Sequence, residues 1–444
     1  MQSLRSLSFA FVASLVLLPA LAAQDSTAKP EERPTGLPKG PTWTFNISAG
    51  VGYFTYGNSL YEANRPDAPP AGTGANWAEG YVKPSISAVL PTGKSELYGA
   101  LAVVGERTFA APPPLVGSEA SSYGLENLYI GWRSGKSLSI GENAIDISLG
   151  MEPFKLGQGL LLWDGGAEGG VRGGYWSNAR SAWLYAAIAK FNLKASTIDL
   201  FALQRNPVPG YDQKNKVYGI NYQLMLGTAT TLGATYMHLA NDSLAYRDGE
   251  NVYNLRAFTS PFRSLPDLAI NAEYAYEDNG NLLSSNGWYA EIGYTFSKVA
   301  WKPVLSYRYA WFEGDNPSTT KSEAFDPLFT GFYDWGTWWQ GEIAGEYFLL
   351  NSNLISNQIR LRATPNDKLS PNLIAYFFSL DRAPMSVTSK DIGFELDAIL
   401  DWKMNANMTF SFVLATLSPG GAVKQEFNRT SNLNYGMIYF AYSY

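Results

Sequence analysis

Arg360 and Arg362, in the last quarter of the sequence, are spaced to act together on one ligand. Alternate residues of an extended strand point to the same face, so the two guanidinium groups lie about 7 Å apart along it. Ile359 and Leu361 occupy the opposite, apolar face. Two guanidinium groups at this spacing can hold a carboxylate-bearing solute through bidentate hydrogen bonds.

The segment from 391 to 402 carries a row of carboxylates in the same alternating pattern. Asp391, Glu395 and Asp397 fall on one face, whereas Phe394 and Leu396 fall on the other. This period of two predicts a β-strand rather than a helix. In a soluble sheet such carboxylates face water, and in a membrane barrel they line an aqueous lumen. The pattern by itself fits both structures.

The same reading of the other alternating segments gives a set of charged side chains for the path of a solute. The set is Lys83, Arg256, Glu273, Arg308, Arg360, Arg362, Asp391, Glu395 and Asp397. Each of these charges has a second interpretation, as one half of an ion pair that stiffens the wall. Tyr218, Ile220 and Tyr222 are expected to point the other way, out of the barrel.

Residues for catalysis or metal binding are sparse. The single histidine, His238, shares its parity with Tyr236 on the expected outward face. HExxH, CxxC and phosphate-loop patterns do not occur in the sequence. We therefore expect no enzyme activity, no cofactor and no bound metal. Asp315, Asp326 and Asp334 have the chemistry of Ca²⁺ ligands, but their spacing fixes no site, and Ca²⁺ binding stays open.

The N-terminal residues predict export. A short basic start at Arg5 precedes an apolar run and small residues at 20–23, as in a signal peptide spanning 1–23. The run is shorter than the roughly 20 apolar residues that a membrane helix needs. Residues 24–41 are rich in proline and charge and are expected to form a mobile periplasmic leader. The structured part is placed at 42–444.

Composition and loop spacing favour a transmembrane antiparallel β-barrel. The aromatic content of 14% and the 42 Gly suit interfacial aromatic girdles and many turns. A net charge of -6 without a basic stripe excludes nucleic acid as a partner. Long connections are expected at 107–121, 153–179, 206–215, 241–250, 278–286 and from 313, and they alternate with short ones at 134–142, 192–195, 227–228, 260–266 and 298–301. Outer-membrane barrels place long loops outside the cell and short turns in the periplasm.

The alternation of loops also sets the expected number of strands. If Thr337–Leu349 were a strand, a long loop would be missing after it. We assign this segment to a large extracellular loop, helical and folded partly into the lumen, which leaves about 18 strands. Ile438, Phe440, Tyr442 and Tyr444 alternate at the end of the chain and resemble the signature that the barrel assembly machinery binds. Membrane lipid and this machinery are the expected partners.

Two stretches resemble a known family. Phe325–Phe332, followed by Asp334 and the Arg360 strand, is similar to the C-terminal half of the alginate export family of outer-membrane barrels. Ile147–Gly159 is similar to the family's strand-to-loop segment, with Gly150-Met151-Glu152 where a glycine-arginine-glutamine often stands. The resemblance implies an eighteen-stranded barrel in the outer membrane of a Gram-negative bacterium that exports an anionic polysaccharide.

The expected lumen carries both signs of charge, whereas a conduit for a polyuronate should be strongly positive. We therefore expect a passive outer-membrane channel for a hydrophilic, charged solute, with export of an alginate-like polysaccharide as one form of this function. The alternative is a plugged barrel that acts as a receptor or surface-interaction protein.

Overall fold

The computed structural model of the chain describes residues 40–60, 72, 74–110, 120–163, 165–166, 172–177, 179–207 and 215–444. The predicted signal peptide, residues 1–23, lies outside the described residues, as does the predicted leader except for its last two positions. The first strand begins at Thr42.

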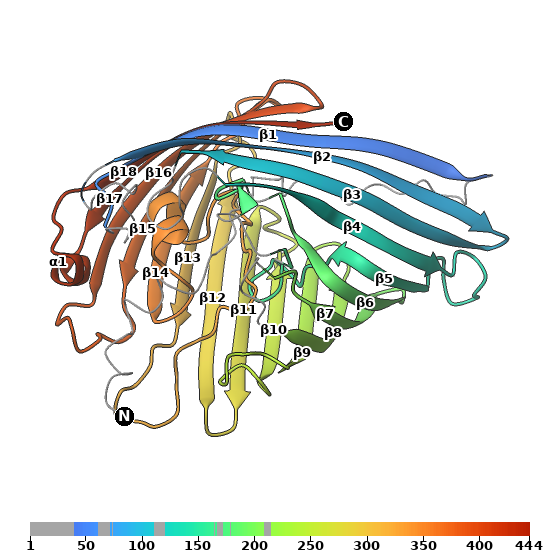
Figure 1. Cartoon of the computed structure of the whole chain (residues 1–444), viewed down its shortest axis with the longest axis horizontal. Coiled ribbons are helices and arrows are strands. Elements are labelled where there is room, and N and C mark those ends of the chain that lie inside the picture. Colours follow the sequence, from blue (N-terminus) through green and yellow to red (C-terminus); the bar gives the residue numbers. More distant parts are fainter. Residues whose placement is uncertain are drawn as a thin grey trace.

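The described residues form one closed, 18-stranded antiparallel sheet (Figure 1). β1 (Thr42–Gly57) pairs with both β2 (Ala75–Thr92) and β18 (Leu433–Ser443), which closes the barrel. The other strands follow in chain order: β3 (Ser95–Phe109), β4 (Ser121–Arg133), β5 (Ile145–Pro153), β6 (Ala182–Asn192), β7 (Ser196–Gln204), β8 (Lys216–Leu226), β9 (Thr230–Ala240), β10 (Asn251–Thr259), β11 (Leu268–Asn279), β12 (Leu283–Thr295), β13 (Val304–Phe312), β14 (Leu354–Arg362), β15 (Leu369–Ser379), β16 (Asp391–Lys403) and β17 (Met408–Pro419). The predicted all-β barrel of about 18 strands is confirmed.

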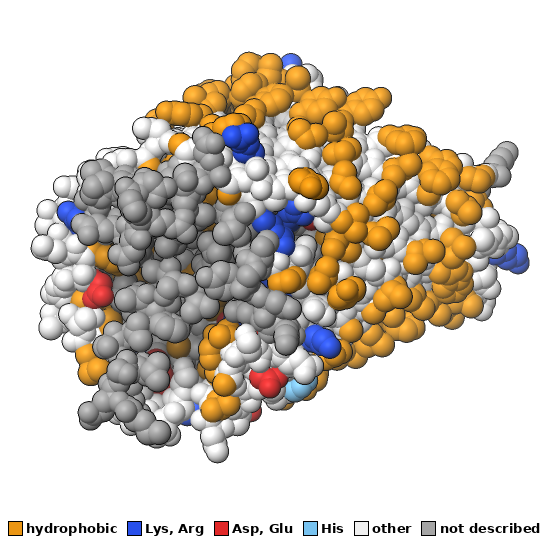
Figure 2. All heavy atoms as spheres, in the orientation of Figure 1, with side chains coloured by type: hydrophobic (Ala, Val, Ile, Leu, Met, Phe, Trp, Pro, Cys, Tyr) orange, Lys and Arg blue, Asp and Glu red, His pale blue; other side chains and the backbone are white. Residues whose placement is uncertain are grey.

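Closure of the sheet satisfies the backbone hydrogen bonds without help from water, as a membrane requires. The outer face is apolar: Tyr218, Ile220 and Tyr222 are exposed on β8, as their alternation predicts. Figure 2 shows hydrophobic side chains gathered over the outer wall, and Trp43 and Phe45 of β1 are among the exposed ones. Among the described residues, no helix has both the length and the apolar character needed to cross a membrane.

Long connections gather at one end of the barrel and short turns at the other. β2 and β3 are joined by a tight turn after Thr92, whereas the chain between β13 and β14 runs from 313 to 353. A short helix, α1 (Gly421–Phe427), lies in the connection between β17 and β18. The predicted alternation of long loops and short turns is confirmed in general. It is wrong between β11 and β12, where residues 280–282 form a short turn and not the long connection predicted at 278–286.

Two stretches of the long connections fold into the barrel, and we call them the first inner segment (residues 154–163) and the second inner segment (residues 325–349). The second contains a single π-helical turn, η3 (Gly341–Gly345), seen as the short orange coil in Figure 1. Thr337–Leu349 is thus no strand but a partly helical, buried part of a large loop, as predicted. The two segments are joined by backbone hydrogen bonds from Trp163 N to Phe329 O (2.9 Å) and from Phe329 N to Leu161 O (3.0 Å).

One β-bulge changes a predicted face. β15 and β16 pair in step up to Phe378 and Gly393, and then Ser379 pairs with Asp391, so that Ile392 is an extra residue. A bulge of this kind reverses the alternation beyond it. Ile392 is buried and Asp391 is exposed. The prediction that Asp391 shares the lumen face with Glu395 is wrong, because the alternation was continued through the bulge.

Candidate functional site

The carboxylates of β16 hold the second inner segment. Glu395 accepts hydrogen bonds from the backbone N–H groups of Ile343 (2.7 Å) and Ala344 (2.8 Å), one at each oxygen. Asp397 accepts one from Glu342 N at 3.0 Å. Both carboxylates are completely buried. They face the interior, as the alternation predicts, but they are engaged with the protein backbone rather than with open lumen.

Carboxylates of β2 and β4 anchor the connection between β5 and β6 in the same way. Glu79 accepts hydrogen bonds from Trp176 N (2.8 Å) and Ser177 N (2.9 Å). Glu126 accepts them from Ser181 N (2.7 Å) and Ala182 N (3.1 Å). Sequence reasoning did not identify these two residues. Their inward parity is readable from the strands, but the loop backbone that they bind is distant in the chain.

Arg308 of β13 is the centre of a buried ion cluster. Its Nη2 lies 2.5 Å from Glu291 Oε2, and the same nitrogen donates a hydrogen bond to Asp334 of the second inner segment. The guanidinium group lies 4.1 Å from the ring centroid of Trp335. Burial raises the pKa of Asp334, against the lowering effect of Arg308. Arg308 therefore fixes the second inner segment to the wall.

A second ion cluster involves the motif that carries the family resemblance. Arg247 donates from Nε to Asp326 Oδ2 at 2.8 Å and from Nη2 to Asp326 Oδ1 at 2.5 Å, which makes a bidentate pair. Asp326 also accepts a hydrogen bond from Leu328 N at 2.9 Å. The pair ties the connection between β9 and β10 to the second inner segment. Sequence reasoning missed it, because Arg247 lies outside every alternating segment.

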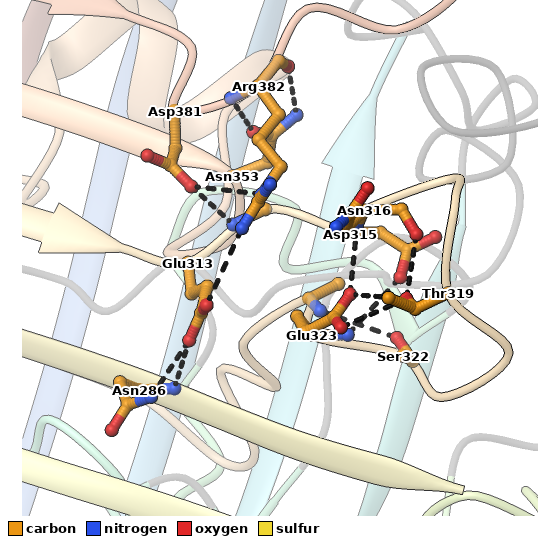
Figure 3. Close-up of polar contacts among 12 residues, drawn as sticks. Asn286, Glu313, Asp315, Asn316, Thr319, Ser322, Glu323, Asn353, Asp381 and Arg382 are labelled. Atoms are coloured by element: carbon orange, nitrogen blue, oxygen red, sulfur yellow. Dashed lines mark hydrogen bonds and ion pairs between the residues drawn. The ribbon is translucent and has the colours of Figure 1, made fainter.

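The loop that carries the second inner segment is also clamped at the rim (Figure 3). Glu313 accepts hydrogen bonds from Asn286 N (3.1 Å) and Asn286 Nδ2 (2.8 Å), and Arg382 lies 3.8 Å from its other oxygen. At the other end of the loop, Asn353 Nδ2 donates to Arg382 O at 3.0 Å. Both ends of this loop are thus fixed to neighbouring connections, and the second inner segment lies between these two fixed ends.

Arg360 and Arg362 are not paired with carboxylates among the described residues. Arg360 Nε donates to Asn372 Oδ1 and Arg362 Nε to Ser370 Oγ, both at 3.0 Å. The Arg360 guanidinium lies 5.0 Å from the Trp335 ring centroid. Ile374, fully buried on β15, stands in register between Arg360 and Asp397 and separates the arginine from the acidic row.

Arg256 is likewise held by neutral groups. It donates from Nη1 to Thr235 Oγ1 at 2.9 Å and makes further hydrogen bonds to the amide oxygens of Asn221 and Asn254. Glu273 is its register partner on β11 and accepts from Asn254 Nδ2 at 3.0 Å. Salt-bridge distance to a carboxylate is not reached by Arg256 within the described part of the chain.

Lys83 of β2 lies beside the connection between β5 and β6, and Lys155 belongs to this connection. Lys83 Nζ donates to Ala179 O at 2.9 Å, which gives Lys83 an anchoring role. Lys155, in the first inner segment, places its Nζ 3.6 Å from the ring centroid of Trp163. Burial lowers the pKa of Lys155 to about 8, opposed by the negative charge of Asp334. Lys155 was not among the predicted path residues, because it lies in a loop where alternation gives no face.

The structure brings together only part of the predicted set of path residues. Trp335 brings Arg308 and Arg360 together, and Arg362 lies on the same face of β14. Lys83 is apart from them, and Asp391 is outside the barrel. His238 lies on the outer face with its ring 3.1 Å from Asn251 Oδ1. Within the described residues, His, Cys, Asp and Glu side chains form no group of three suited to a metal ion.

Residues 269–436 match the model of the alginate export family. This match includes the Phe325–Phe332 motif and confirms the resemblance there, whereas the 147–159 stretch lies outside it. Comparison with curated proteins gives no match.

Solved outer-membrane porins share the fold across nearly the whole chain. OccK2 (OpdF) of Pseudomonas aeruginosa matches with a TM-score of 0.60 at 11% identity, over 90% of this chain and 97% of that one. A BenF-like porin from Pseudomonas fluorescens Pf-5 matches with a TM-score of 0.59 at 10% identity, over 90% and 98%. OccAB2 of Acinetobacter baumannii matches with a TM-score of 0.58 at 11% identity, over 91% and 98%. At these identities the likeness concerns the fold.

Proposed function

We propose that this chain, a porin-like outer-membrane barrel whose residues 269–436 match the alginate export family, conducts a hydrophilic anionic solute selected by basic side chains of its lumen. The family match and the closed barrel support a channel. Arg256, Arg360 and Arg362 are the residues to which we assign the selection. Both the family and the fold are those of channels rather than of enzymes.

The proposal rests on a difference between the negative and the positive side chains of the interior. The negative ones are bonded to backbone N–H groups or to an arginine, whereas two of the positive ones are, within the described part of the chain, bonded only to neutral side chains. The interior carboxylates Glu395 and Asp397 bind backbone N–H groups, and Glu291 binds Arg308. Arg360 and Arg362 make hydrogen bonds only to neutral side chains among the described residues. Of these charges, the ones left to act on a solute are therefore positive, although the chain as a whole carries a net charge of -6. Low-dielectric walls focus such a field along the path.

The chemistry of the basic residues suggests a carboxylate as the solute's charged group. Guanidinium groups bind carboxylates through two parallel N–H···O bonds, and they stay charged at every physiological pH. Arg360 and Arg362 stand two residues apart on one strand face, which allows a carboxylate to pass from one to the next. An acidic sugar, free or within an alginate-like polysaccharide, has this group.

A plugged barrel that acts as a receptor is the second candidate. The observation in its favour is the hydrogen-bonded junction between the two inner segments, with Leu161 and Phe329 both fully enclosed. A permanent junction would close the barrel to solutes. Such a protein would carry no current in a planar bilayer.

The test is the reversal potential of the purified protein in a planar bilayer under a salt gradient. We expect Arg360→Gln/Arg362→Gln to move the reversal potential toward cation selectivity while the protein still folds. Lys302→Gln/Lys368→Gln is the matched control, since it removes two exposed positive charges near the short turns. A reversal potential that moves equally in both variants removes Arg360 and Arg362 from the solute path.

A further inference from the structure

Four carboxyl groups meet, fully buried, where the second inner segment docks on the wall. Glu342 and Glu346 belong to the segment, and Glu395 and Asp397 belong to β16. The β16 pair holds η3 through the backbone N–H groups of Glu342, Ile343 and Ala344. Glu395 and Asp397 stand two residues apart on the inward face of β16, so their carboxyl groups lie on the same side of the strand.

Other elements around this cluster bring further acids and few bases. Glu79 of β2 acts electrostatically on Glu346, and Asp401 of β16 acts on Glu342. The tyrosines that face the cluster are Tyr56, Tyr175, Tyr347, Tyr376 and Tyr435. Arg308 acts electrostatically on Tyr376, but it is paired with Glu291 and Asp334. Among the described residues around the cluster, none supplies a free positive charge that would neutralise it.

Docking of the second inner segment on the wall therefore depends on the protonation of these carboxyl groups. Burial raises the pKa of Glu342 to about 8, and Asp397 adds to the shift. Burial also raises the pKa of Glu346 well above its ordinary value, with Glu342 and Glu79 as further causes. A carboxyl group whose pKa is raised in the docked state stabilises that state at low pH and loses this contribution as pH rises. Ionisation of the cluster thus opposes docking.

We propose that Glu395 and Asp397 are positioning residues of the pore, which hold the second inner segment in the lumen by a carboxyl latch that releases as the cluster ionises. Release moves η3 away from the wall and widens the path. This inference goes beyond the proposed function, because it concerns the cross-section of the pore and not the sign of the charge that passes.

The test is the accessibility of η3 to a water-soluble thiol reagent. The chain has no cysteine, so Ile343→Cys gives a single reporter at a position that is fully buried in the docked state. A methanethiosulfonate reagent is applied to the reconstituted full-length barrel at about pH 6 and about pH 9. Met385→Cys, at a position that is 77% exposed, corrects for the faster reaction of any thiolate at high pH.

We expect the corrected labelling rate of the Ile343→Cys variant to rise by up to roughly tenfold per pH unit for each proton that must be lost for release. Glu395→Ala/Asp397→Ala, added to the Ile343→Cys variant, removes the acceptors of three backbone N–H groups. Labelling should then be roughly 10- to 100-fold faster at both pH values. Adding Glu395→Gln/Asp397→Asn keeps carbonyl acceptors without charge and should reduce the rise in labelling rate with pH, because only Glu342 and Glu346 of the four carboxyl groups are then left to ionise.

Folding is checked by heat-modifiable migration on gels. If the double alanine variant does not fold, Glu342→Gln, which leaves the wall unchanged, must by itself reduce the rise in rate with pH. A labelling rate of the η3 reporter that does not depend on pH, or that the alanine substitutions leave unchanged, overturns the latch. Because labelling needs no ion current, either result is separate from a failure of anion selectivity.

Discussion

Replacement of Arg308 by methionine should destabilise the barrel strongly at neutral pH and little in acid. The substitution leaves Glu291 with the Trp335 indole N–H, 3.4 Å away, and leaves Asp334 without its cationic partner. Breaking a buried ion pair by removing one partner costs about 3–5 kcal/mol. A buried carboxylate that has lost its partner can take up a proton, and this limits the cost. For one carboxyl group with an ordinary pKa of about 3.9, protonation at pH 7 costs about 4 kcal/mol.

The dependence on pH follows from the same groups. Burial already raises the pKa of Asp334 in the native chain, and loss of Arg308 removes the main opposing effect. A raised pKa stabilises the folded state below the unfolded pKa and loses this effect as pH rises. We therefore expect Arg308→Met to lower the free energy of unfolding by about 3–4 kcal/mol at pH 7 and by less than about 1 kcal/mol near pH 4.

The assay is reversible urea unfolding in lipid vesicles, followed by tryptophan fluorescence, at both pH values. Arg308→Met/Glu291→Gln/Asp334→Asn is the matched control, since it replaces the three charges by neutral groups and should regain most of the lost stability. Equal destabilisation at pH 7 and pH 4 would refute the reasoning, because a loss of packing does not depend on pH.

Further predictions concern the loops, the path and the C-terminal strand. Arg247→Met leaves Asp326 buried without its bidentate partner and should cost about 3–5 kcal/mol in the same unfolding assay. Lys155 loses its charge as pH rises through about 8, so anion selectivity should fall over that range, and Lys155→Arg should abolish the fall in bilayer recordings. Asp391→Asn, outside the barrel, should leave the reversal potential unchanged. Deletion of Tyr442–Tyr444 should leave protease-sensitive protein in the periplasm, whereas normal surface levels would contradict a role in assembly.

Local alternation was enough to predict the wall. Tyr218 and Ile220 point outward and Arg308 and Gln358 inward because a pleated strand facing lipid on one side admits no other arrangement. The spacing of the connections was enough to remove Thr337–Leu349 from the wall. Both signals are carried by residues that are near one another in the chain.

The contacts of the inner segments could not be predicted from such signals. Glu395 was expected in open lumen, but it binds the backbone of residues 343 and 344. Nothing in the local sequence of β16 distinguishes a carboxylate that faces water from one that accepts backbone N–H groups of a distant loop. The bulge at Ile392 is a further example, since an extra residue reverses the faces of a strand without changing its composition.

The central claim, that the charges left to act on a solute are positive, is tested most directly by the reversal potential of the unmodified barrel. The protein is inserted into a planar bilayer of neutral lipid, with potassium chloride more concentrated on one side. A reversal potential displaced toward the equilibrium potential of chloride is the predicted result. A displacement toward the equilibrium potential of potassium would contradict the account.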